Sequence, residues 1–141
     1  MNRVDDLVAY YENLSEGSVD DLARFYAPDA YFKDPFNEVR GVEAIGRILR
    51  HMFRQVDGPR FAVRERVVAD NGVMLTWEFT FRFRQWRPHT VQRVRGASHL
   101  RFDGEGRVAY HRDYWDAAEE MYAKLPLIGW IARRLQRALQ A

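Results

Sequence analysis

The sequence predicts a single α+β domain, in which helices come first and a mostly antiparallel sheet follows. Apolar residues recur at helical spacing in three segments before residue 57, and from residue 61 the pattern repeats every two residues instead. Chains that run through helices and then through strands are typical of α+β domains. The chain has 141 residues, of which 47% are hydrophobic, so one domain with a buried core is expected.

Three helices account for the first part of the chain. The first presents one apolar stripe, which consists of Val4, Leu7, Val8, Tyr11 and Leu14. The second is expected to begin at Ser18, which with Asp21 resembles a capping box, and Pro28 is expected to end it. The third begins at Val42, and Gly58-Pro59 is expected to end it.

Strands are expected at residues 30–34, 61–68, 75–84, 90–102 and 108–115. Alternation is strongest in 75–84, where aromatic and aliphatic residues alternate with charged and hydroxyl residues, so one face of this strand is buried. Asp70-Asn71-Gly72 predicts a tight hairpin turn before this strand, and a second hairpin turn is expected at residues 103–106.

The end of the chain is expected to be helical. Asp116 can cap a helix that runs through Lys124. An amphipathic segment follows, with an apolar face beside three arginines; these residues are Ile128, Ile131, Leu135, Leu139, Arg133, Arg134 and Arg137. A membrane-surface helix is one interpretation. A helix that closes a pocket mouth or packs on a second subunit is the commoner structure, and we prefer it.

Composition and charge exclude several classes of protein. A net charge of +2 is too small to indicate a nucleic-acid partner, and no apolar run approaches the length of a membrane span. The chain has no cysteine, and no two of its four histidines are spaced as metal ligands, so no metal site is expected. No Gly-rich phosphate loop or nucleophile elbow is present, so no cofactor is expected. Acids stand where a signal peptide needs apolar residues, so a cytoplasmic protein is expected.

Two segments carry a resemblance to a known family. Val8-Ala9-Tyr10 with residues 25–35 (FYAPDAYFKDP), and residues 100–108 (LRFDGEGRV), resemble the nuclear transport factor 2-like superfamily, in particular its ketosteroid isomerase and polyketide cyclase (SnoaL-like) branch. The resemblance covers roughly residues 4–118 and leaves 119–141 as a C-terminal helical extension. It implies a cone-shaped fold, in which a strongly curved, mostly antiparallel sheet wraps around about three N-terminal helices and encloses a pocket.

The resemblance implies catalytic positions within that pocket. Ketosteroid isomerase uses an Asp base in an Asp-Pro pair and a Tyr on the first helix as an oxyanion donor. Asp34 precedes Pro35 here, and Tyr10 lies 24 positions upstream, as in that family. The family's second donor, a protonated Asp, corresponds to Ser98, which is a departure from the pattern. From the residues alone, Asp34 is equally well explained as the start of an Asp-Pro turn.

The same alignment directs His111, Asp113 and Trp115 into the pocket, although alternation alone would instead bury the opposite face of this strand, with Tyr110 and Tyr114. His111 is then expected to pair with Asp34 or Asp113 and to tune its protonation. The alternative interpretation of Asp113 is an ordinary strand residue that is exposed to solvent. The apolar faces of the second and third helices are expected to contribute Tyr26 and Phe53 to ligand binding.

Three functions remain open. The first is an acid–base enzyme acting on a small apolar molecule with a carbonyl or epoxide group, in which Asp34 moves a proton and Tyr10, helped by Ser98, holds the oxyanion. The second is a binding module for such a molecule without turnover. The third is a protein-interaction domain, which meets a partner or its own copy through the outer sheet face with Arg93, Arg95, Arg101 and Tyr110; a homodimer is compatible with all three.

Overall fold

A computed structural model describes residues 3–121 and 126–140 of the chain. Helical segments are α1 (Arg3–Glu12), the 3₁₀ helix η1 (Gly17–Arg24), α2 (Val42–Gln55), α3 (Ala117–Glu120) and α4 (Pro126–Leu139). The strands are β1 (Tyr26–Lys33), β2 (Glu38–Arg40), β3 (Val56–Ala69), β4 (Gly72–Phe83), β5 (Gln92–Phe102) and β6 (Val108–Tyr114). The predicted α+β class is confirmed, because helices precede a sheet of six strands.

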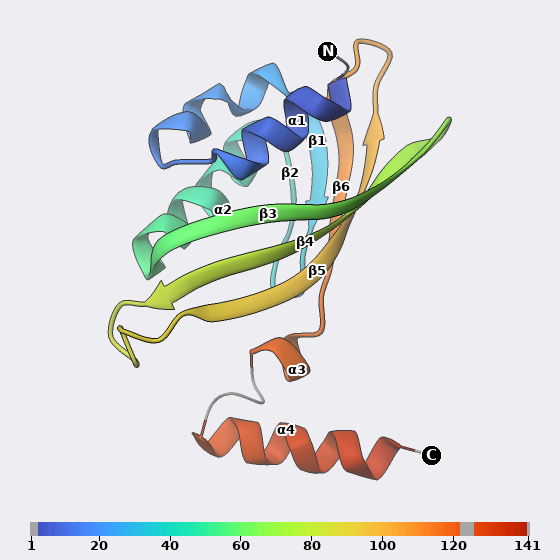
Figure 1. Ribbon diagram of the computed structural model, residues 1–141. Coiled ribbons are helices and arrows are strands. Elements are labelled where there is room, and N and C mark those ends of the chain that lie inside the picture. The colour runs from blue at the N-terminus through green and yellow to red at the C-terminus, as the bar shows by residue number, and fades with distance from the viewer. Residues whose placement is uncertain (1–2, 122–125, 141) are drawn as a thin grey trace.

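The six strands form one curved sheet in the order β2-β1-β6-β5-β4-β3. Every neighbouring pair is antiparallel except β1 and β6, which run parallel. The sheet bends around α1, η1 and α2, which lie on its concave side, while α3 and α4 lie beyond one end of it (Figure 1). This arrangement is the curved sheet around N-terminal helices that the resemblance implied.

The second helix differs from its prediction. It is a 3₁₀ helix that ends at Arg24, and the chain passes directly into β1, because Tyr26 pairs with Val108 of β6. Pro28 therefore lies inside a strand, at a register shift between Tyr26 and Tyr31, where its missing N–H breaks no ladder. The predicted capping box is also wrong, since the Ser18 hydroxyl bonds to Ser15 instead.

Gly58-Pro59 does not end α2 as expected. The helix ends at Gln55, and the next residue, Val56, already belongs to β3. Gly58 has a φ of +60°, which disfavours residues with a Cβ, and the ladder between β3 and β4 shifts register between Asp57 and Arg60. The Gly-Pro pair thus bends the start of a strand.

The core lies between the helices and the concave face of the sheet. Its largest fully buried side chains include leucines and an isoleucine from α1, η1, α2, β4 and β5: Leu7, Leu22, Ile45, Leu75 and Leu100. A second cluster follows the alternate positions of β4 that the sequence predicted to be buried, and it consists of Trp77, Phe79 and Phe81 with Val56 and Val94. Because this face of the sheet is strongly curved, the two clusters enclose a hollow.

Two helices follow the sheet, as expected. Asp116 caps α3 by accepting a hydrogen bond from the backbone N–H of Glu119, at 3.0 Å. This helix ends at Glu120, and the predicted extension through Lys124 lies outside the described residues. None of the helices within 3–121 and 126–140 combines the length and the apolar content needed to cross a membrane.

Candidate functional site

A cavity of about 260 Å³ lies between the helices and the concave face of the sheet. Its walls are mostly apolar and include side chains of α1, η1, α2 and five of the strands. The apolar lining includes Leu14, Ile48, Leu49, Met52, Phe61, Leu75, Phe79 and Phe81. Polar groups enter it chiefly from β1, β5 and β6. Asp34, Ser98, His111 and Asp113 all line it, so most of the residues selected from the sequence face one cavity.

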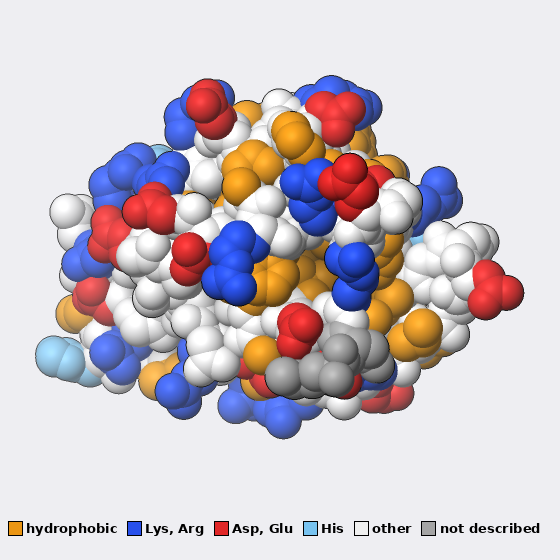
Figure 2. All heavy atoms as spheres, turned by 90° about the horizontal axis from the view of Figure 1, so that it is seen from above, with side chains coloured by type: hydrophobic (Ala, Val, Ile, Leu, Met, Phe, Trp, Pro, Cys, Tyr) orange, Lys and Arg blue, Asp and Glu red, His pale blue; other side chains and the backbone are white. Residues whose placement is uncertain are grey.

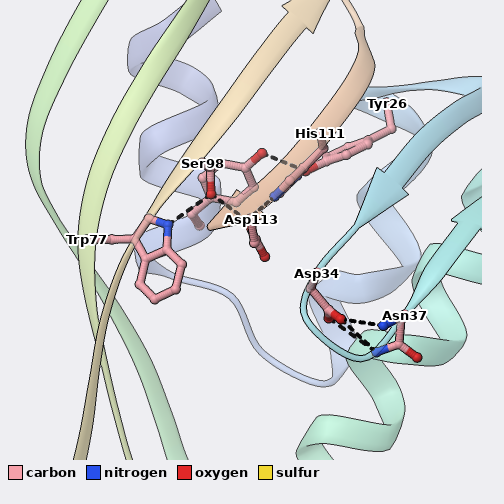
Figure 3. A network of polar contacts seen from close by, with 8 residues as sticks. Tyr26, Asp34, Asn37, Trp77, Ser98, His111 and Asp113 are labelled. Atoms are coloured by element: carbon pink, nitrogen blue, oxygen red, sulfur yellow. Dashed lines mark hydrogen bonds and ion pairs between the residues drawn. The ribbon is translucent and has the colours of Figure 1, made fainter. Parts of the chain in front are cut away.

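A chain of hydrogen bonds runs along one wall of the cavity (Figure 3). The hydroxyl of Tyr11 lies 2.6 Å from that of Tyr26, which in turn lies 2.6 Å from Nδ1 of His111. Nε2 of His111 lies 2.6 Å from Oδ1 of Asp113. The chain thus joins α1 and β1 to β6, and it ends on a carboxylate.

A second branch reaches the same carboxylate oxygen from β5 and β4. The indole N–H of Trp77 donates to the Ser98 hydroxyl at 2.9 Å, and that hydroxyl donates to Oδ1 of Asp113 at 2.5 Å. Oδ1 therefore receives hydrogen bonds from both Ser98 and His111, while Oδ2 has no hydrogen-bond partner in residues 3–121 and 126–140. Asp113 keeps one oxygen available beside the cavity.

The direction of the first branch follows when Asp113 is ionised and the His111 ring is neutral. An ionised Asp113 only accepts, so Nε2 of His111 carries the proton of that bond, and in the neutral ring Nδ1 is then an acceptor. Tyr26 must donate to Nδ1, which leaves its oxygen to accept from Tyr11. Burial raises the pKa of Tyr11 and of Tyr26 above the ordinary value, so both phenols stay protonated near neutral pH, as this arrangement needs.

The pairing of β6 explains why its polar side chains face inward. Asp113 is paired with Ser98, and His111 with Leu100, and both partners are buried on the concave face. Tyr110 points to the outer face, where it stacks on Tyr31 at 5.2 Å. The inward face that the alignment gave is confirmed, and the choice from alternation alone is wrong, because the outer face supplies aromatic and cation–π partners to the tyrosines.

Asp34 lines the cavity, but it also holds a turn. One of its carboxylate oxygens accepts from the backbone N–H of Phe36 at 2.8 Å and from that of Asn37 at 2.6 Å, and the Asn37 side chain binds it as well. These bonds are those of the Asp-Pro turn that the sequence offered as an alternative. Lys33 of β1 pairs with Arg112 of β6, and these two strands run parallel. The next residues, Asp34 and Asp113, are therefore neighbours across the two strands.

Tyr10 also lines the cavity, but its hydroxyl donates to the backbone carbonyl of Ser18 at 2.7 Å. Its ring stacks on Phe25 at 4.3 Å, and burial raises its pKa to about 12. The phenol that joins the polar chain is that of the next residue, Tyr11, which sequence reasoning assigned to the apolar stripe of the helix. The sequence signal for this residue was the pair of adjacent tyrosines, 10 and 11. Because neighbouring residues lie about 100° apart around a helix, the two phenols reach different partners.

The structure also places the four expected ligand-binding residues. Ser98, Trp115 and Tyr26 line the cavity. Phe53 does not line it; the neighbouring residue of α2, Met52, does. No group of three His, Asp or Glu side chains in the described part of the chain is arranged to hold a metal ion. On the outer sheet face, Arg95 pairs with Glu120, and Arg101 lies over the Tyr110 ring.

Comparisons with known proteins agree with the fold. The model of the SnoaL-like domain family matches residues 7–111. A protein of ketosteroid isomerase-like fold from Catenulispora acidiphila, solved with trimethylamine, superposes with a TM-score of 0.73 at 18% identity, over 92% of this chain and 96% of that one. No curated protein matches the sequence.

Two further solved structures share the fold. An LEH-like epoxide hydrolase from M. tuberculosis superposes with a TM-score of 0.67 at 18% identity, over 95% of this chain and 93% of that one. An NTF2-like protein of unknown function from Exiguobacterium sp. gives a TM-score of 0.69 at 16% identity, over 82% of this chain and 98% of that one. At these identities the likeness concerns the fold alone.

Proposed function

The chain belongs to the SnoaL-like domain family, and on that premise we propose that it is an acid–base enzyme for a small apolar molecule with a carbonyl or an epoxide oxygen. Such a site supports proton removal next to a carbonyl, addition of water, or dehydration. The structural relatives of this fold include an epoxide hydrolase, which is compatible with the second of these reactions. The cavity, at about 260 Å³, lies just below the usual range for small-molecule sites, which favours a small substrate.

The proposal depends on one observation, the carboxylate of Asp113 beside an apolar cavity. His111 and Ser98 hold Oδ1, so the carboxylate cannot rotate freely, and Oδ2 is left to take a proton from a substrate carbon or from a water molecule. A general base must stand within hydrogen-bond reach of the proton that it removes, and a fixed side chain holds that geometry. In this proposal Asp113 is the base and His111 positions it.

Asp34 and Tyr10 take the second part of the reaction. Asp34 follows β1 and lies beside Asp113 across the β1–β6 pair. In this proposal it relays the proton that Asp113 removes to or from the substrate. Tyr10 lies in the cavity wall and stabilises the developing oxyanion when its hydroxyl exchanges the Ser18 carbonyl for the substrate oxygen. The test of this last role is Tyr10→Phe, which removes the hydroxyl and keeps the ring.

Exchange of protons in D₂O tests the proposal with a panel of simple compounds. Monocyclic and bicyclic ketones are incubated with the protein, and NMR follows the loss of the protons next to the carbonyl; alkyl and aryl epoxides are assayed in parallel for diol. We expect turnover of at least one compound above the buffer rate, and Asp113→Asn should lower it about 100-fold or more. Asp29→Asn is the matched control, because Asp29 is exposed and does not line the cavity. Turnover that Asp113→Asn leaves at the wild-type rate would overturn the assignment.

A binding module is the second candidate, and the contacts of Asp34 and Tyr10 favour it. Both side chains are already engaged by the protein's own backbone, Asp34 by the turn at 36–37 and Tyr10 by Ser18. A binder would show saturable thermal stabilisation by the same ketones and epoxides without turnover. Its binding would survive Asp34→Asn, whereas the enzyme would lose rate in that variant.

A further inference from the structure

Helix α4 has an apolar face that the rest of the described chain leaves uncovered. Its members are spaced three or four residues apart, so they share one side of the helix, and they are 50%, 48%, 60% and 84% exposed: Ile128, Ile131, Leu135 and Leu139. Helix α3 is the described element that packs against α4, which lies apart from the sheet and the N-terminal helices in Figure 1. An apolar stripe of this size in water needs a partner.

The charge of this region differs from that of the domain. From Met121 to the end the chain carries four basic side chains and no acid, whereas residues 1–120 carry 18 basic against 20 acidic side chains. Figure 2 shows acidic and basic side chains interspersed over the face of the molecule seen from above, which is typical of a solvated surface. The excess positive charge of the protein is therefore carried by its C-terminal segment.

The cations of α4 lie opposite its apolar face. Trp130, Arg134 and Arg137 follow each other at intervals of four and three residues, so they share a side, and the Arg134 guanidinium lies 5.1 Å from the centre of the Trp130 ring. A helix with apolar residues on one side and arginines on the other matches the interface between lipid headgroups and acyl chains. With 14 residues it is about 21 Å long, which suits a helix lying in the membrane plane.

We infer that α4 binds to the surface of bilayers that contain anionic lipids, with its apolar face among the acyl chains and its arginines at the headgroups. Charge complementarity selects this occupant over a second copy, because a second copy carries the same excess of positive charge in this segment, whereas an anionic bilayer carries the opposite charge. An anionic bilayer supplies both the apolar phase and the counter-charge. Lipid binding does not depend on whether the cavity is catalytic.

The inferred membrane contact would also hold the cavity near lipid. Helix α3, which packs on α4, is tied to β5 by the ion pair of Glu120 with Arg95, at 2.8 Å. Trp115 and Met121 stand just before and just after α3, and both line the cavity. This step rests on the proposed function: an apolar substrate dissolved in the bilayer would reach the site from the membrane.

Flotation with vesicles tests the inference on the full chain. The protein is mixed with vesicles of phosphatidylcholine and phosphatidylglycerol in equal amounts, and in parallel with vesicles of phosphatidylcholine alone. We expect the protein to float with the mixed vesicles, to bind the neutral vesicles much more weakly, and to be released by high salt. Arg137→Gln should weaken binding about fivefold, and Leu135→Asp more than tenfold.

Gln140→Asp is the matched control for Leu135→Asp, because it adds the same charge at an exposed position just after the end of α4, outside the apolar face. Circular dichroism confirms that each variant keeps its fold, and sedimentation gives its oligomeric state. Equal binding to both kinds of vesicle, or none, would overturn the inference. A dimer that Leu135→Asp dissociates, without vesicle binding, would overturn it in favour of a contact between copies.

Discussion

The indole of Trp77 lies over Gly96, the residue of β5 with which Trp77 is paired. A Cβ at position 96 would stand 2.5 Å from the Trp77 ring and 3.0 Å from Cβ of Trp115. Trp77 supplies the hydrogen bond that begins the second branch to Asp113 through Ser98. Because Gly96 has no side chain, the Trp77 indole can lie where it donates to Ser98. Ser98 in turn donates to the Asp113 carboxylate.

Gly96→Ala is expected to displace the indole and break its bond to Ser98. The unfolding free energy should fall by about 1 to 3 kcal/mol, because a methyl group is forced into a packed region. Urea denaturation followed by tryptophan fluorescence measures this loss, and the proton-exchange assay should show a slower rate. Gly104→Ala is the control, since a Cβ there meets nothing within 4 Å. Equal stability of the two variants would contradict the prediction.

The buried phenols give the protein a dependence on alkaline pH. Burial raises the pKa of Tyr10 to about 12 and moves the pKa values of Tyr11 and Tyr26 in the same direction. Near pH 10 the unfolded chain begins to lose these protons while the folded chain keeps them, so the unfolded state binds fewer protons and stability falls as pH rises. Below about pH 10 the contribution is fully present.

Urea midpoints at about pH 9 and about pH 11 measure this effect, with the lower midpoint expected at the higher pH. Tyr10→Phe should lessen the difference between the two midpoints. The variant lacks the phenol at position 10, so unfolding at alkaline pH releases one proton fewer. Tyr114→Phe serves as the control, because Tyr114 is 45% exposed. A midpoint that stays constant between the two pH values would contradict the assignment of raised pKa values.

At this scale the sequence predicted the site's composition better than its contacts. The resemblance placed Asp34, Ser98, His111 and Asp113 in one cavity, because strand register follows the alignment. It could not show that the Tyr10 hydroxyl binds Ser18, nor that Tyr11 joins the polar chain. Those contacts depend on how α1 is rotated against η1 and β1, and tertiary packing decides that rotation.

At the scale of elements, a buried carboxylate ties α3 to the sheet. Glu120 is 7% exposed, and its Oε1 lies 2.8 Å from Nε of Arg95 on the outer face of β5. Its other end is capped by Asp116. A helix of one turn has little stability of its own, so these side chains fix its position.

Arg95→Gln is expected to loosen α3 while leaving the sheet intact. The effect should be confined to α3, because Arg95 itself is largely exposed and the carboxylate that it binds is not. Hydrogen exchange read by mass spectrometry should be faster in residues 116–121 only. Arg93→Gln on the same strand is the control, as its ion pair to Glu78 is longer, at 3.9 Å. Unchanged exchange at α3 in the Arg95 variant would contradict this account.

The strand and helix boundaries show which local signals were decisive. The hairpin at residues 70–72 and the alternation of β4 were predicted correctly, because turn chemistry and burial act there in the same direction. Pro28 and Gly58-Pro59 were interpreted as helix stops, and both lie in strands at register shifts. Proline is excluded from a helix interior, but a shifted ladder admits it, and only the paired strand reveals the shift.

At the scale of the whole molecule, the cavity links stability to ligand binding. A compound that fills it binds the folded state alone, so at about 100 times its Kd it should add about 2.7 kcal/mol to the unfolding free energy. For a chain of this length the melting temperature would rise by about 5 to 10 °C. Thermal denaturation with the best ketone or epoxide of the panel measures it.

Leu49→Trp is expected to abolish that rise, because Leu49 lines the cavity and a larger side chain would occupy the space. The variant should melt no lower than about 2 °C below the wild type, since the new ring enters a hollow instead of a packed region. Val91→Trp adds the same ring at an exposed position and should keep the rise. A rise that persists in Leu49→Trp would show that the compound binds elsewhere.

The parallel contact of β1 with β6 has a consequence for how the protein is made. His111 and Tyr26, which share a hydrogen bond, are 85 residues apart, and β6 is the strand that joins β1 and β2 to the other three. Until the ribosome has released β6, the growing chain holds two separate groups of strands with open edges. Loop closure over such distances slows folding, so a chain truncated before residue 108 should aggregate instead of forming a partial cavity. The wall that carries His111 and Asp113 is among the last parts of the cavity to be completed.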